Sequence, residues 1–71
     1  MMTILENLIR CELSDAEDCT DRNNVNAYFH NAYGATCLAL NVAKTEAEYN
    51  AIMRMWDDYK EEFENLMWGE N

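Results

Sequence analysis

Residues 45–69 read TEAEYNAIMRMWDDYKEEFENLMWG, and this stretch decides the fold class. Large apolar side chains recur in it three or four residues apart, which is the period of one face of an α-helix. Thr45 followed by Glu48 matches the capping box that begins helices, and Gly69 stands where a glycine commonly ends them. The apolar stripe consists of Tyr49, Ile52, Trp56, Tyr59, Phe63 and Leu66, with Met55 and Met67 at its edges. The stretch therefore predicts a helix over residues 46–68.

Residues 25–43, directly before this helix, carry no formal charge, whereas the segments on either side are acidic. This pattern is typical of a buried central helix between two solvated ones. One apolar face is predicted, made of Val25, Phe29, Tyr33, Cys37 and Leu40. A second row holds small side chains that would let a neighbouring helix approach closely: Ala27, Asn31, Ala35, Ala39 and Ala43. Gly34 costs about 1 kcal/mol relative to alanine inside a helix, which is tolerable under a close contact and otherwise marks a bend.

The first 24 residues predict a short helix followed by a polar loop. Thr3 and Glu6 fit a second capping box. One apolar face follows it, made of Ile4, Leu5, Leu8, Ile9 and Leu13. We expect a helix over residues 4–13 and a loop over residues 14–24, in which Ser14 with Glu17 could cap one helical turn.

The whole chain, residues 1–71, is expected to form one domain. It has no proline and only two glycines, fewer turn residues than an all-β fold needs. Short connections favour helices that pack against their neighbours in sequence. The predicted fold is therefore all-α, a small three-helix bundle with two long antiparallel helices and a shorter N-terminal helix.

The charge of the chain limits the partners that it can bind. Fourteen carboxylates against five lysines and arginines give a net charge of −9. Nucleic-acid backbones and anionic membranes would repel this charge, whereas a basic partner protein would not. The N-terminal residues do not match a signal peptide, and no run of 18 apolar residues occurs. Three cysteines without an export signal favour a reducing compartment, so we expect a cytoplasmic protein.

The chain contains residue types that act in catalysis or bind metals, but their spacings do not match those of a catalytic or metal site. His30 and Cys37 on one helix would be about 10.5 Å apart along its axis, too far for a nucleophile to bond to its base. The possible metal ligands Cys11, Cys19, His30 and Cys37 match no zinc pattern. The paired carboxylates of the third helix face water rather than a cleft. The sequence therefore predicts no enzyme, no cofactor and no metal site, although a metal or redox role of the cysteines stays open as an alternative.

The acidic residues of the third helix are badly placed for stability. Asp57–Glu61 and Asp58–Glu62 are like-charge pairs four residues apart, each unfavourable by roughly 0.2–0.5 kcal/mol. Glu64 and its neighbours approach the helix C-terminus, where negative charge opposes the helix dipole. Pairing of Arg54 with Asp58 and of Lys60 with Glu64 would offset only part of this cost. Because residues that break local rules are candidates for function, we take these carboxylates as a candidate binding surface.

Trp68 is the other residue that a simple bundle does not explain. At 100° per residue it lies roughly 160° from the centre of the apolar stripe. It either folds back over the helix end or contacts a partner. Met53 and Met55 widen the apolar face, which suits self-association or a partner groove. The candidate partner-binding residues are Asp57, Asp58, Glu61, Glu62, Glu64 and Trp68.

In size and charge the chain resembles the small acidic inhibitors of mobile genetic elements, such as anti-CRISPR and anti-restriction proteins that imitate nucleic acid. This resemblance implies a non-enzymatic inhibitor or modulator that docks an acidic helical face on a basic partner, of which a nucleic-acid-binding protein is one kind. The alternative is a homo-oligomeric helical protein, such as a homodimer, whose acidic surface only keeps it soluble. Met53, Met55 and Trp68 would then form its interface.

Overall fold

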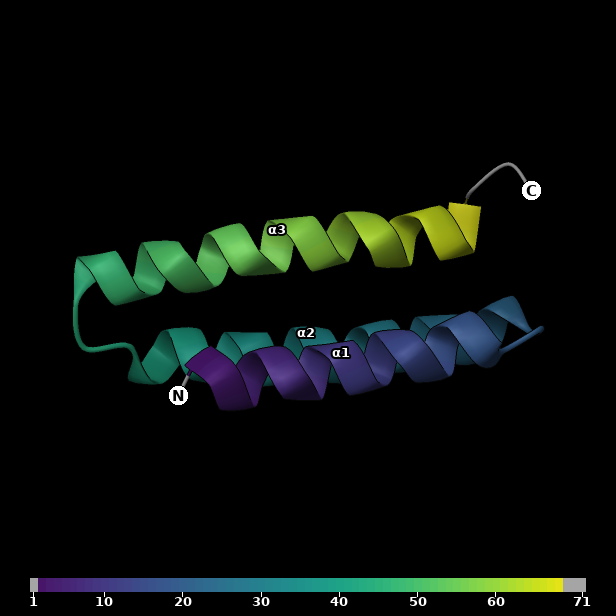
Figure 1. Ribbon diagram of the computed structural model, residues 1–71, viewed down its shortest axis with the longest axis horizontal. Helices are drawn as coiled ribbons and strands as arrows, with labels where there is room; N and C mark the ends of the chain where they lie inside the picture. The colour runs from purple at the N-terminus through teal and green to yellow at the C-terminus, as the bar shows by residue number, and fades with distance from the viewer. Residues whose placement is uncertain (1, 69–71) are drawn as a thin grey trace.

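The computed structural model describes residues 2–68, which form three helices that all contact one another. They are α1 (Met2–Asp18), α2 (Arg22–Val42) and α3 (Glu46–Trp68). The chain reverses its direction at each connection, so that α3 runs along the pair formed by α1 and α2 (Figure 1). No strand occurs in the described residues. The predicted all-α, three-helix fold is confirmed, in a molecule of 39 × 18 × 16 Å.

The first helix is longer than the sequence analysis predicts. It covers Met2–Asp18 instead of residues 4–13, and the loop shrinks from residues 14–24 to residues 19–21. The reason is that Leu13 and Ala16 are buried and extend the helix's inner face by another turn. Burial of this face outweighs the local preference of the polar residues around it for a loop.

The starts of the first two helices differ from the expected capping. Thr3 lies inside α1 and Glu6 bonds to the third helix, so these two residues do not form a cap. In α2, Asp21 is the N-cap: its backbone is extended and its side chain accepts a hydrogen bond from Asn23 N at 2.9 Å. An aspartate in this position satisfies one of the free amides of the first turn. The helix consequently begins at Arg22 rather than at residue 25.

The third helix has the bounds that its sequence indicates. Glu48 N donates to Thr45 Oγ1 at 3.1 Å, and Lys44 N donates to the Glu48 carboxylate at 3.1 Å. These two bonds make the capping box. The Glu48 carboxylate accepts from the amide of Lys44, one residue before the amide of Thr45 that a capping box usually uses. Gly69 lies outside the described residues.

Small side chains occupy the middle of the buried face of α2. Ala32 is fully buried, and the buried Thr36 hydroxyl donates to the Ala32 carbonyl at 2.9 Å, so its polar atom is satisfied. The expected small row is wrong only in its first half: Ala27 and Asn31 are exposed, whereas Ala39 is buried and Ala35 and Ala43 pack against the core. The buried row runs instead through Val25, Ala32, Thr36 and Ala39. Since α2 touches both other helices, small side chains along this line let them approach closely.

An aromatic cluster joins α2 to α3. The ring of Phe29 lies 5.7 Å from that of Trp56 and 5.7 Å from that of Phe63, measured between centroids. Tyr33, expected on the inner face, is half-exposed and borders Trp56 at 5.9 Å. The larger side chains of α2 thus pack beside the small row rather than on it. Within residues 2–68, no helix has the length and apolar character needed to cross a membrane.

Candidate functional site: the outer face of the third helix

Five carboxylates gather on the solvent side of α3, and we call this set the acidic face. Asp57, Glu61 and Glu64 follow one line along the helix, because steps of four and three residues return to the same side. Asp58 and Glu62 form a second line next to it. All five side chains are exposed. The helix therefore brings together the acidic residues that the sequence analysis selected.

The buried residues of α3 determine where the acidic face points. Ile52 and Phe63 are fully inaccessible, and Trp56 and Met67 are nearly so. These four side chains hold one side of the helix against α1 and α2, so the opposite side faces water. The acidic face thus lies on a packed helix that is held in place along its whole length.

Within residues 2–68, no basic side chain forms an ion pair with the acidic face. Arg10 and Glu6, both in α1, form the only ion pair within residues 2–68, with Nη2 and Oε2 3.4 Å apart. The expected pairs of Arg54 with Asp58 and of Lys60 with Glu64 do not form. The like-charge repulsion along α3 is therefore offset even less than the sequence suggests.

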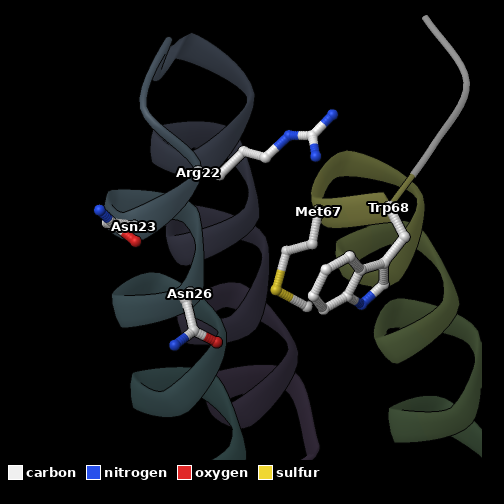
Figure 2. Close-up of a pocket in the computed structure, with 5 residues that line it drawn as sticks. All are labelled: Arg22, Asn23, Asn26, Met67 and Trp68. Atoms are coloured by element: carbon white, nitrogen blue, oxygen red, sulfur yellow. The ribbon is translucent and has the colours of Figure 1, made fainter.

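Trp68 extends the outer line of the acidic face. It follows Glu64 by four residues, and 74% of its surface is exposed, so it does not fold back into the core. Instead Met67 is buried at the helix end. Figure 2 shows the Arg22 side chain reaching from α2 toward Met67 and Trp68. Together with Asn23 and Asn26 these residues line a pocket of about 410 Å³.

The methionines do not form the exposed apolar surface that the alternative function requires. Met53 and Met55 are half-buried, and Met55 packs against the core. The exposed aliphatic side chains lie on the first two helices: Ile4, Leu8, Leu38 and Val42. The sequence contains a pattern that could have identified these residues. In α1 and in α2, two large apolar residues lie one turn apart, next to the row of buried residues of that helix. Ile4 and Leu8 are expected from the sequence on the apolar face of the first helix, whereas Leu38 and Val42 belong to neither predicted row of the second helix.

The groups that could carry metal or redox chemistry lie apart from one another. All three cysteines are free thiols: Cys11 is exposed, whereas Cys19 and Cys37 are half-buried. In the part of the chain that the structure describes, no three His, Cys, Asp or Glu residues are placed to hold a metal ion. His30 is exposed and lies against the ring of Phe29, with centroids 5.6 Å apart.

Comparisons of the chain with protein-family models, with curated proteins and with solved structures found no match.

Proposed function

We propose that the protein is a non-enzymatic binding module whose acidic face docks on a basic partner protein. The observation that carries this proposal is the set of five exposed carboxylates that form no ion pair in the described part of the chain, continued by the exposed Trp68. A protein gains no stability from such an arrangement, because like charges three or four residues apart repel one another. A basic partner would remove this repulsion.

The spacing of the acidic face suits a partner that holds phosphates. Carboxylates three or four residues apart on a helix lie about 5–6 Å from each other, close to the scale on which phosphates repeat along a nucleic-acid strand. Lysines and arginines that hold a nucleic-acid backbone would find similar charges along α3. Trp68 adds a large apolar side chain of the kind that often anchors an interface. We therefore favour an inhibitor or modulator of a nucleic-acid-binding protein, acting in the cytoplasm, where free thiols persist.

The test uses variants in which carboxylates are replaced by amides, which removes their charge while nearly keeping the shape of the side chains. The first variant combines Asp57→Asn, Asp58→Asn, Glu61→Gln and Glu62→Gln. A matched control removes four exposed charges elsewhere, through Asp15→Asn, Glu17→Gln, Asp18→Asn and Glu46→Gln. Both variants have the same net charge, so a difference between them reports on position. Each is used to capture partners from the native cell, with washes at low and at high salt.

We expect the wild type and the control to retain a basic partner at low salt. The first variant should bind it at least tenfold more weakly, which corresponds to about 1.4 kcal/mol. High salt should release the partner, since the screening length falls from about 10 Å at 0.1 M to about 3 Å at 1 M. The free first variant should be no less stable than the wild type, because repulsion is relieved. Unchanged binding together with lost stability would show that the acidic face is structural.

A further inference from the structure

A groove on the surface between α1 and α2 is lined by apolar side chains. Its volume is about 550 Å³, and the buried side chains of Leu5 and Ala39 form its floor. Ala35 is half-buried and completes the lining. The four rim residues are large, aliphatic and exposed: Ile4, Leu8, Leu38 and Val42. Contiguous apolar surface of this kind marks an interaction site more often than scattered exposed residues do.

The side of α1 that carries Leu8 continues into two carboxylates beyond the groove. Glu12 follows Leu8 by four residues and Asp15 follows it by seven, so both return to the same side of the helix. Both also lie near Tyr28 of α2, because the pKa of its phenol is raised by the charge of Cys19, by burial and by the charges of Asp15 and Glu12. The two carboxylates therefore face the surface shared by α1 and α2.

Glu12 holds a carboxylate oxygen that the chain leaves without a donor. Its Oε2 is buried and accepts no hydrogen bond within residues 2–68, although the residue as a whole is only half-buried. Buried polar atoms are nearly always hydrogen-bonded, so an exception needs an explanation. No basic side chain of the described fold pairs with Glu12 or Asp15, since Arg10 with Glu6 forms its only ion pair. A donor from another molecule would satisfy this oxygen.

We propose that the groove and the two carboxylates bind one amphipathic helix of a partner protein, apolar along two turns and basic in the turns that follow. The charge of Glu12 and Asp15 selects the basic end, and the uncharged lining selects the apolar part. A helix fits better than an extended segment, because an added strand needs a sheet edge and residues 2–68 form only helices. A second copy of this chain offers no such helix, since no two of its basic residues lie one turn apart.

The spacing of the lining residues defines the helix that fits. In α2 the groove extends from Ala35 to Val42, which is about 10.5 Å of helix. Along α1, Glu12 lies about 6 Å beyond Leu8 and Asp15 about 10.5 Å beyond it. The partner helix should therefore carry apolar residues at positions i, i+3 and i+7 and basic residues at i+11 and i+14, all on one face.

This surface is separate from the acidic face. Only α1 and α2 line the groove, where the start of α1 lies beside the end of α2 (Figure 1). None of the lining residues comes from α3. A helix bound in the groove therefore leaves the acidic face free, and the two proposals can fail independently.

The test titrates the full chain with two synthetic peptides of about 18 residues, long enough for the five positions. The first carries leucines at i, i+3 and i+7 and arginines at i+11 and i+14. The second carries citrulline in place of each arginine, which removes the charge and nearly keeps the shape. Calorimetry measures the affinities, and amide NMR shifts locate the bound peptide. The arginine peptide should shift the amides of residues 4, 8, 38 and 42 and bind about fivefold more tightly than the citrulline peptide.

Two protein variants assign the two parts of the site. Leu38→Gln should weaken both peptides about tenfold, because it removes an apolar wall of the groove. Glu12→Gln should weaken only the arginine peptide, since the citrulline peptide has no charge for Glu12 to pair with. The matched control is Glu17→Gln, which removes the same charge from an exposed residue of α1 about 140° around the helix from Glu12. It should change neither affinity by more than about twofold.

Each other outcome overturns the proposal. Peptide shifts confined to residues 57–64 would place the peptide on the acidic face instead. Equal affinities of the two peptides for the wild type would remove the basic end, and this comparison needs no variant to fold. Equal effects of Glu12→Gln and Glu17→Gln would reduce the charge preference to the net charge of the chain. The absence of groove shifts at about 1 mM peptide would exclude a helix of this chemistry, whatever the capture experiment on the acidic face shows.

Discussion

Arg10, in α1, donates a hydrogen bond from Nε to the hydroxyl oxygen of Tyr59, in α3, over 2.7 Å. The same hydroxyl donates to Glu6 Oε2 at 2.9 Å, and Arg10 Nη2 lies 3.4 Å from that carboxylate oxygen. Within residues 2–68, the bonds of the Tyr59 hydroxyl with Arg10 and with Glu6 are the only side-chain hydrogen bonds that join two helices. The hydrogen bond that Arg10 donates to Tyr59, together with the charge of Glu6, raises the pKa of Arg10, so the guanidinium remains charged. The three side chains fix how α3 lies along α1.

Removing the Tyr59 hydroxyl should therefore loosen this contact. We expect Tyr59→Phe to lower the free energy of unfolding by about 0.5–1.5 kcal/mol, since the ring stays in place and only the polar contacts are lost. The control is Tyr49→Phe, an exposed residue of the same helix whose hydroxyl makes no hydrogen bond in the described part of the chain. Urea unfolding measures both. Equal effects of the two substitutions would mean that the Arg10 contact does not stabilise the fold.

The small row of α2 should not accept a large side chain. Ala32 is fully buried between the other two helices, so Ala32→Leu should destabilise the protein by about 1–3 kcal/mol through overpacking. Ala27 is exposed, and Ala27→Leu should stay within about 0.5 kcal/mol of the wild type. Thermal unfolding followed by circular dichroism compares them. The opposite ranking would restore the row that the sequence analysis predicted.

Gly34 should be replaceable with a gain in stability. It is exposed, it does not have a positive φ, and a methyl group added to its Cα would meet nothing within 4 Å. Gly34→Ala should therefore stabilise the protein by about 0.4–1 kcal/mol, because alanine loses less conformational freedom on folding. The reciprocal control, Ala27→Gly in the same helix, should destabilise by about 0.5–1 kcal/mol. A loss of stability in Gly34→Ala would indicate that the helix needs a bend there.

Tyr28 should ionise only at unusually high pH. The negative charge of Cys19, then partial burial and the Asp15 carboxylate, raise the pKa of its phenol above the usual value of about 10. The resulting stability is present below pH of about 10 and is lost as the pH rises through the folded-state pKa. Cys19→Ala should lower the pKa of Tyr28, measured by carbon NMR titration of the ring. Cys11→Ala is the control, and an equal change in both variants would contradict the assigned cause.

The third helix could be predicted in full because every signal for it is local. Thr45 and Glu48 cap it, and Ile52, Trp56 and Phe63 repeat with its period. The end of α1 could not be predicted, since residues 14–18 are polar except for Ala16 and remain helical only because Leu13 and Ala16 pack against the rest of the bundle. Local propensity is weak compared with the burial of an apolar face.

The candidate surfaces, too, were determined partly by the sequence and partly by the tertiary structure. The sequence by itself determined the acidic face, because residues 57–64 share one helix whose apolar stripe already turns them toward water. Only the tertiary structure decided that no basic side chain within residues 2–68 pairs with this face, that Trp68 is exposed and that Met55 packs inward. It also decided that Ile4 and Leu38 share one open groove. These properties depend on which sides of the helices face each other. That orientation is decided by side chains distant in sequence, because they pack together in one core.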